Sequence, residues 1–174
     1  MNTPLRRNYI ALAICAMLSN LTACETPSLP KPQIVTGDRF PELQLINLKG
    51  EPVSTAQFAG KVLVFNVWAT WCAPCRKELP SLQRLSEQLD PQRFAVIGMS
   101  VDADAHVVRE FLIERKVTFT NLQDADMRAA QEILGVRAYP STYIITADGV
   151  VRRFVGGAQG WDGPEWQKLI RSID

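Results

Sequence analysis

The sequence predicts one α/β domain in which helices flank a central mixed β-sheet. Short apolar segments rich in β-branched residues alternate with segments of helical periodicity, and an Asp-Gly pair between two β-rich runs marks a late hairpin. Strand–helix alternation that ends in a hairpin and a final helix is typical of this architecture. The 174 residues, 47% hydrophobic and 21% charged, suit one globular domain with its own core.

The first half of the domain carries the strongest strand and helix patterns. Residues 43–48 are expected to form an edge strand or a hairpin arm, followed by a turn at residues 49–50. Residues 62–68 are almost entirely apolar, as in a central strand covered on both faces. The leucines of residues 73–89 recur at helical spacing, and residues 94–101 predict a second apolar strand.

The middle of the domain continues the alternation. Residues 104–116 have the apolar periodicity of a helix, and residues 117–122 predict a short strand. Residues 127–134 predict another helix, which Gly135 is expected to end as a C-cap.

The last segments predict a hairpin and a helix. Residues 142–146 and 150–155 flank Asp148-Gly149, a strong signal for a two-residue hairpin turn. The final helix is expected to begin at Asp162, a good N-cap residue with Glu165 three positions later.

The first 23 residues have the pattern of a lipoprotein signal peptide. Arg6 and Arg7 precede ten apolar residues, 9–18, a run too short to span a bilayer. Residues 21–24, Leu-Thr-Ala-Cys, resemble the bacterial lipobox, which predicts cleavage before Cys24 and attachment of lipid to its sulfur. A plain signal peptide, with Cys24 as a passive residue, is the alternative.

Residues 24–36 are expected to form a lipidated cysteine followed by a proline-rich spacer, and residues 37–174 the folded domain. Three prolines favour an extended chain of about 3 Å per residue, although a segment that folds back onto the domain is the alternative. An anchored domain of this kind would face the periplasm or the outer side of the cell membrane. Cleavage would change the formal charge from +1 to −1, because it removes two basic residues and no acid. Neither value favours nucleic acid.

Two cysteines remain available for chemistry in such a mature chain. Cys15 leaves with the signal peptide, and the lipid blocks Cys24, so Cys72 and Cys75 are the free sulfurs. Small exported domains that use disulfides as structural cross-links carry several dispersed cysteines. One close pair therefore favours a redox function.

The segment Trp71-Cys72-Ala73-Pro74-Cys75 lies where the central strand gives way to a helix. Unpaired N–H groups and the helix dipole stabilise a thiolate at that place, and two intervening residues allow a short disulfide. Cys72 is expected to be exposed and nucleophilic, and Cys75 to be more buried. A structural disulfide would constrain so short a loop little, and a zinc site would lack ligands, since His106 is the one histidine.

Residues 64–80, VFNVWATWCAPCRKELP, resemble the active-site segment of thioredoxins and, more closely, that of the membrane-tethered TlpA/ResA branch with its AhpC/TSA-like domain. The resemblance extends over about residues 37–174 and includes the helix–strand insert that this branch carries around residues 104–122. It implies a thioredoxin-like fold with an N-terminal β extension, and an enzyme that exchanges thiols and disulfides.

The same resemblance implies roles for further residues. Residues 135–140, GVRAYP, match the segment whose proline is cis and lies against the disulfide in thioredoxin folds. Pro140 is therefore expected to follow a cis peptide bond. Tyr139, together with Trp71 and Pro74, is expected to shape the groove that receives the substrate.

Glu78 is the candidate acid for proton transfer. Thioredoxins keep a buried Asp at the position of Asn66, and an amide cannot take a proton. Glu78 matches the acid that the TlpA/ResA branch places near the cysteines. A carboxyl removed from water could accept the Cys75 proton; a solvated helix glutamate is the alternative.

The resemblance implies reduction of protein disulfides by attack of Cys72 and resolution by Cys75. By analogy with the family, the candidate substrates are the haem-attachment cysteines of apocytochrome c or copper-site assembly proteins. A membrane thiol donor would supply the electrons. No metal and no organic cofactor are expected beyond the Cys72–Cys75 disulfide, and the chain is expected to be a monomer. The direction of electron flow depends on partner potentials, which the motif does not fix.

Two other functions compete with this interpretation. A peroxidase of the peroxiredoxin type is one, because residues 37–41, GDRFP, also open such domains. Those enzymes have Thr or Ser three residues before the reactive cysteine, where this chain has Ala69. A copper chaperone is the other, but related carriers use three residues between the cysteines and a distant His.

Overall fold

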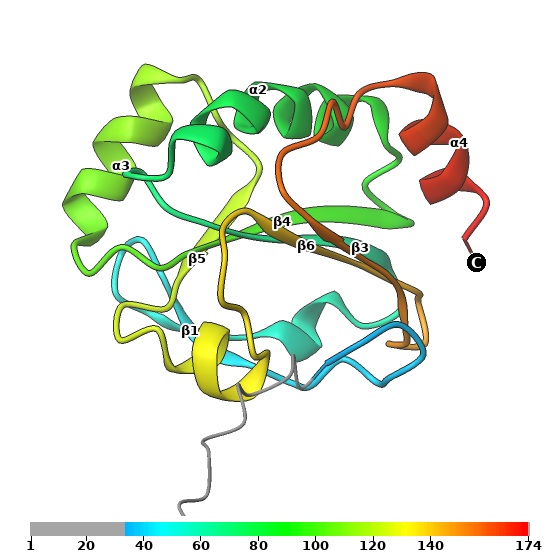
Figure 1. The fold of residues 1–174 in the computed structure, drawn as a ribbon, viewed down its shortest axis with the longest axis horizontal. Coiled ribbons are helices and arrows are strands. Elements are labelled where there is room, and N and C mark those ends of the chain that lie inside the picture. Colours follow the sequence, from blue (N-terminus) through cyan, green and yellow to red (C-terminus); the bar gives the residue numbers. More distant parts are fainter. Residues whose placement is uncertain (1–33, 174) are drawn as a thin grey trace, which may run out of the picture.

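The computed structural model describes residues 34–173, which fold around one seven-stranded mixed sheet (Figure 1). The strand order is β2-β1-β5-β4-β3-β6-β7, with β3, β4 and β5 parallel and the other neighbours antiparallel. The strands are β1 Gln44–Asn47, β2 Pro52–Ser54, β3 Val62–Trp68, β4 Phe94–Ser100, β5 Thr120–Gln123, β6 Ser141–Ile145 and β7 Val151–Gly156.

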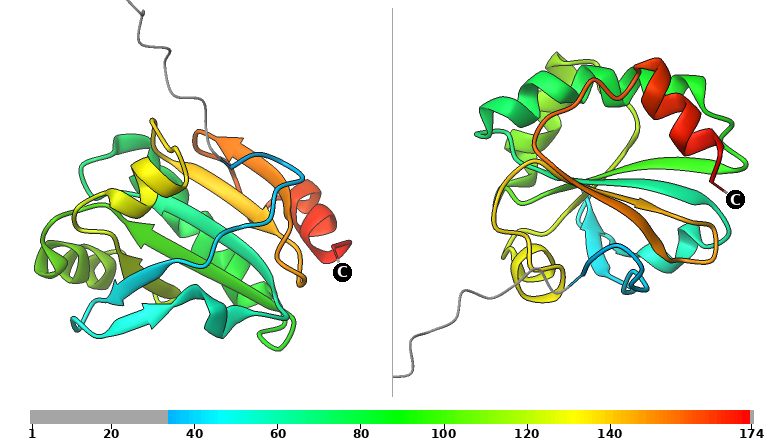
Figure 2. Two further views of the ribbon diagram at one scale, coloured as in Figure 1. Left: turned by 90° about the horizontal axis from the view of Figure 1, so that it is seen from below. Right: turned by 45° about the vertical axis from the view of Figure 1, so that its right-hand side comes forward.

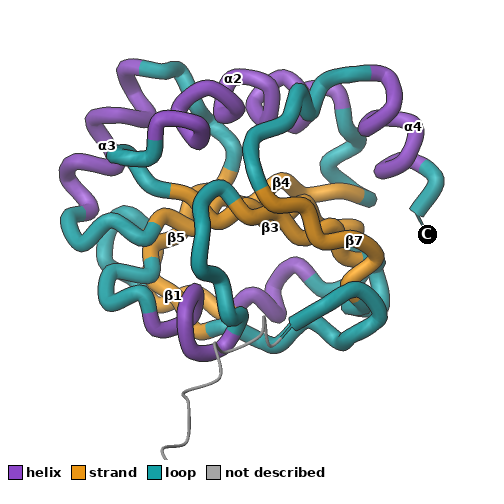
Figure 3. Tube along the Cα trace, viewed as in Figure 1, coloured by secondary structure: helices purple, strands orange, loops and turns teal. Residues whose placement is uncertain are grey.

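Three helices cover one face of this sheet (Figures 1 and 2). They are α2 Ala73–Gln88, α3 Ala105–Glu114 and α4 Pro164–Arg171. The steps β3-α2-β4 and β4-α3-β5 move across the sheet in one direction, so right-handed crossovers place both helices on the same side. The short turns η1 Thr55–Phe58 and η2 Ala129–Ile133 lie on the opposite face. Figure 3 shows the strands as a layer between these two sides.

Strand β3 is the centre of the fold. All seven of its residues are buried, and it pairs with β4 and β6 along most of its length. On the face opposite the helices, the Phe40 ring packs against Phe65 at 5.1 Å and Tyr143 at 5.4 Å between centroids. The segment that precedes β1 thus covers the sheet with an aromatic layer.

Most predicted elements are confirmed, with shifts of a few residues at several ends. The β1–β2 hairpin forms the N-terminal β extension, and α3 with β5 forms the helix–strand insert. Residues 43–48 do contain a hairpin arm, but β1 lies inside the sheet, and β2 forms the edge. The helix expected at residues 127–134 is one wide turn, η2, followed by Gly135 at φ 70°.

The predicted cap of the last helix is wrong. Helix α4 begins after Gly163 with no side-chain cap, and the Asp162 carboxylate instead accepts a hydrogen bond from Arg84 at 2.6 Å. The expected spacer is described only from Ile34 onward, and Ile34 packs against the core. The predictions for residues 1–23, including Cys15, and for Cys24 lie outside the described residues.

A glycine in β4 lets two buried side chains meet across the sheet. The Asn121 Oδ1 atom accepts a hydrogen bond from Trp68 Nε1 at 3.0 Å, and Trp68 is fully buried. A Cβ on Gly98 would stand 2.0 Å from that oxygen and 2.9 Å from the indole nitrogen. Gly98 is therefore required by this close approach.

We expect Gly98→Ala to lower the free energy of unfolding by about 1–3 kcal/mol, because the new methyl group displaces Asn121 and strains the packing around Trp68. Urea denaturation measures the change. Gly156→Ala is the matched control, since a Cβ there meets nothing within 4 Å, and it should change stability by less than about 0.5 kcal/mol. Equal effects of the two substitutions would contradict this account.

Candidate active site

Cys72 and Cys75 form a disulfide at the start of α2. The two sulfurs are 2.08 Å apart, and the Cα atoms are 5.3 Å apart. Strand β3 ends at Trp68, and Cys72 is the N-cap residue of the helix, with its sulfur accepting the Cys75 N–H at 3.2 Å. The predicted placement of the pair at a helix N-terminus is thus confirmed.

The disulfide is more enclosed than its sequence position suggested. Cys75 is completely buried, as expected, but Cys72 exposes only 6% of its surface in this oxidised form. Trp71 is 58% exposed, and its ring meets the edge of Tyr139 at 5.6 Å between centroids. The Tyr139–Pro140 peptide bond is cis, as predicted. The exposed Trp71 ring and the half-buried Tyr139 ring therefore lie together at the surface next to Cys72 in the chain.

The loop before Cys72 is held by an acid that sequence reasoning missed. Asp102 is almost fully buried and accepts hydrogen bonds from the Thr70 N–H at 2.9 Å, the Thr70 hydroxyl at 2.6 Å and the Ser100 hydroxyl at 2.7 Å. The sequence did carry a signal, because Asp102 directly follows the strand predicted at residues 94–101. Side chains at the carboxyl ends of such strands converge at one edge of the sheet.

Glu78 is buried beneath the helix start, with 2% of its surface exposed. Its Oε2 atom accepts hydrogen bonds from Trp161 Nε1 at 2.9 Å and the Gln159 N–H at 3.1 Å, and its Oε1 atom accepts one from Asn66 Nδ2 at 2.8 Å. Burial raises the pKa of the Glu78 carboxyl above its ordinary value, while these hydrogen bonds lower it. The interpretation of Glu78 as a solvated glutamate is therefore wrong.

Two partners of Glu78 were not predicted because they are distant in sequence. Gln159 and Trp161 belong to the loop between β7 and α4, and Ser81 fixes that loop further by accepting the Trp161 N–H at 3.1 Å. Trp161 is fully buried, so its indole N–H needs a partner inside the protein. That partner is Glu78 Oε2, 83 residues earlier, and no local pattern in the sequence marks the pair.

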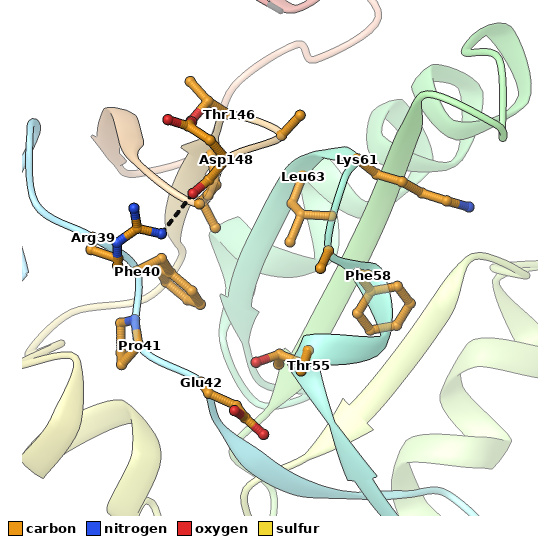
Figure 4. Close-up of a pocket in the computed structure, with 15 residues that line it drawn as sticks. Arg39, Phe40, Pro41, Glu42, Thr55, Phe58, Lys61, Leu63, Thr146 and Asp148 are labelled. Carbon is orange, nitrogen blue, oxygen red and sulfur yellow. Dashed lines mark hydrogen bonds between the residues drawn. The ribbon is translucent and has the colours of Figure 1, made fainter.

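A metal site and a cavity are the two other kinds of site that the described residues could offer. Among residues 34–173, no group of three or more His, Cys, Asp or Glu side chains is placed to hold a metal ion, and His106 is exposed. A cavity of about 190 Å³ lies at the opposite end of β3, near Leu63 (Figure 4). Its walls include Phe40 and Phe58, and its Arg39 donates to the Asp148 carbonyl at 2.7 Å. It lies away from the disulfide and adds nothing to that chemistry.

The mixed sheet, the disulfide at the N-terminus of α2 and the cis proline directly before β6 define a thioredoxin-like thiol–disulfide oxidoreductase. The chain belongs to the AhpC/TSA family, whose model matches residues 36–154.

Individual relatives agree with this class. The chain is 32% identical over 152 residues to the thioredoxin-like protein YneN of Bacillus subtilis (strain 168). The aligned region covers 84% of this chain and 88% of YneN. It is 26% identical over 153 residues to the thiol-disulfide oxidoreductase ResA of the same strain, and the aligned region covers 88% of this chain and 84% of ResA. A solved structure of a secreted Mycobacterium tuberculosis disulfide oxidoreductase homologous to E. coli DsbE has 27% identity and a TM-score of 0.65. The match covers 75% of this chain and 96% of that one.

We expect Glu78 to make stability depend on pH. Because folding raises the pKa of this carboxyl, its contribution favours the folded state below about pH 4.5 and weakens as pH rises through the folded pKa. Glu78→Gln removes that dependence. The difference in unfolding free energy between wild type and Glu78→Gln, measured by urea denaturation of the oxidised proteins, should therefore shift against the wild type as pH rises.

Another buried carboxyl, that of Asp124, does not affect that comparison. Burial also raises the pKa of its carboxyl, and it is unchanged in both proteins, so its contribution cancels in the difference. A difference that stays constant between about pH 4 and 8 would contradict the burial of an ionisable Glu78.

Proposed function

We propose that this protein reduces protein disulfides outside the cytoplasm. The observation that carries the proposal is the Cys72–Cys75 disulfide at the N-terminus of α2, with a buried carboxyl one turn further along the helix. The names of the relatives YneN and ResA support thiol–disulfide exchange as the reaction class.

The proposed reaction transfers two electrons to the substrate. The Cys72 thiolate attacks one substrate sulfur, so that a mixed disulfide forms and the second substrate sulfur leaves as a thiolate and takes up a proton. The Cys75 thiol then loses its proton and attacks the Cys72 sulfur. The substrate sulfur bonded to Cys72 then leaves as a thiolate and takes up a proton. The Cys72–Cys75 disulfide is left oxidised until a thiol donor restores the two thiols.

Glu78 is the proposed acceptor of the Cys75 proton. Both side chains lie on the buried face of α2, three positions apart, which places them on neighbouring turns of one helix face. A carboxyl whose pKa is raised by burial is a better base at neutral pH than an exposed one. The proposed groove residues are Trp71, Pro74, Tyr139 and Pro140, because the exposed Trp71 ring directly precedes Cys72 and contacts the half-buried Tyr139 ring.

The competing functions find less support. Ala69 is buried and brings no hydroxyl to the site, as peroxide activation of the peroxiredoxin type requires. A copper chaperone would need a further ligand near the sulfurs, and no such cluster occurs in residues 34–173.

The proposed location is the outer side of a bacterial membrane, with Cys24 lipidated after loss of residues 1–23. One solved relative is described as secreted. Within the described part of the chain, no helix has the length and hydropathy that a bilayer crossing requires. The proposed partners are a membrane thiol donor and a disulfide-bearing substrate such as apocytochrome c or a copper-site assembly protein, in keeping with a role in cytochrome c maturation.

We expect Cys75→Ala to trap substrates. Without the resolving thiol, the mixed disulfide on Cys72 persists and appears as a higher band on non-reducing gels that a thiol reductant removes. Cys72→Ala, the matched control, should trap nothing and should reduce a model protein disulfide at least about 100-fold more slowly than the wild type. A Cys72→Ala protein with normal reductase activity would overturn the proposed function.

We expect Cys24→Ser to abolish lipid attachment. In a bacterial host fed labelled fatty acid, the wild type should take up label and partition with membranes, whereas Cys24→Ser should not. Cys15→Ser is the control, because Cys15 lies in the apolar run of the same segment and should leave labelling unchanged. Label that persists in Cys24→Ser would refute the anchor.

A further inference from the structure

One buried acceptor next to Glu78 has no hydrogen-bond partner. Asn66 is completely buried in β3, and its Nδ2 donates to Glu78 Oε1 at 2.8 Å and to Thr142 Oγ1 at 2.9 Å. Its Oδ1 atom is the one buried side-chain N or O atom without a partner among the described residues. Buried polar atoms are nearly always satisfied, so an unpaired oxygen beside an ionisable group calls for a physical reason.

The hydrogen bonds of Glu78 suit only its ionised form. Trp161 Nε1 and the Gln159 N–H can only donate, and both point to Oε2. A proton on Oε1 would face the Asn66 Nδ2 group, which is also a donor. The Oδ1 atom of that same amide is the available acceptor, but it does not take part in the contact as the side chain now lies.

We propose that Asn66 is a positioning residue whose amide turns by half a rotation about its Cβ–Cγ bond when Glu78 takes up a proton. This proposal rests on the proposed function, in which the proton comes from Cys75. After the rotation, Oδ1 accepts the Glu78 Oε1–H, and Nδ2 moves to the place that Oδ1 occupies now. The amide thus offers a donor to the carboxylate and an acceptor to the acid.

Thr142 makes the rotation possible on the other side. It is fully buried in β6, directly opposite Asn66 in the strand register. A hydroxyl can accept in one state and donate in the other by turning its own hydrogen, so Thr142 Oγ1 bonds either end of the amide. An Asp at position 66 would have no donor when ionised, and a Leu would have neither group.

The surroundings point to Cys75 as the source of the proton. Glu78 is faced by Asn66 from β3 and by Gln159 and Trp161 from the loop before α4, none of which titrates at neutral pH. Cys75 is the one other titratable residue on the buried face of α2. The amide would therefore report the protonation that accompanies the sulfur chemistry.

Nuclear magnetic resonance on the full-length, oxidised wild type tests the rotation directly. Between about pH 4 and 9, the side-chain amide signals of Asn66 should follow the titration of the Glu78 carboxyl carbon. The nuclear Overhauser contact between the Asn66 Nδ2 protons and the Thr142 methyl group should be present in the ionised state and lost in the protonated one. In Glu78→Gln, the pH dependence of the Asn66 signals should disappear.

Asn121 is the matched control within the same molecule. Its Oδ1 accepts from Trp68 Nε1 and its Nδ2 donates to the Phe119 carbonyl at 2.9 Å, so both ends are satisfied and neither partner is a carboxyl. The Asn121 amide signals should stay fixed over the same pH range.

Kinetics of the Cys75 step separate this proposal from the proposed function. Asn66→Leu should slow resolution of a mixed disulfide on Cys72 by about tenfold and should alter its pH profile, because the proton on Glu78 loses its acceptor. If Glu78 titrates and Glu78→Gln slows resolution while the Asn66 amide stays unchanged, the rotation is refuted and the proposed function stands. If the amide follows Glu78 but Glu78→Gln resolves at the wild-type rate, the rotation is supported and only the proton transfer fails.

Discussion

The passage from β3 into α2 is the constraint on which the site depends. The strand is buried on both faces and held between β4 and β6, so its last residue, Trp68, has a fixed position. Only three residues then separate Trp68 from Cys72, the N-cap of the helix. Asp102 holds the middle of this short loop through Thr70, by both the backbone N–H and the hydroxyl. The sulfur chemistry therefore takes place at the end of a rigid strand, on a loop with little freedom of its own.

Burying a carboxyl beneath that helix start opposes folding, and the structure shows what offsets it. Each hydrogen bond from a neutral donor to a charged acceptor contributes about 1.5–3 kcal/mol, and Glu78 has three. These bonds also connect α2 with β3 and with the loop before α4. Removal of the Glu78 charge therefore weakens the hydrogen bonds that join these three segments, and it also removes a site that can bind a proton. The Glu78 carboxyl thus couples the packing around Trp161 to its own protonation state.

Local patterns in the sequence predict most of the fold, whereas contacts between distant segments decide where prediction fails. Strand β3, helix α2 and the hairpin around Gly149 follow from apolar runs, periodicity and turn chemistry that act over a few neighbouring residues. The expected cap at Asp162 failed because Arg84, 78 residues earlier, binds that carboxylate instead. For the same reason the sequence identified Glu78 but not Gln159 and Trp161, which lie 81 and 83 residues away. Periodicity carries no information about such pairs.

The burial of Cys72 sets a condition on any partner in the proposed reaction. A thiol–disulfide exchange needs the attacking sulfur to approach one sulfur of the pair directly, and Cys75 is closed to solvent. The remaining route is through the small exposed part of Cys72, beside a tryptophan that is 58% exposed. A partner must therefore cover Trp71 and the adjoining Tyr139 ring in order to bring its sulfur within reach. Burial of these rings contributes hydrophobic free energy only to partners whose disulfide lies on a surface that fits them. In the proposed reaction, access to the sulfur and selection of the partner would thus depend on the same two side chains.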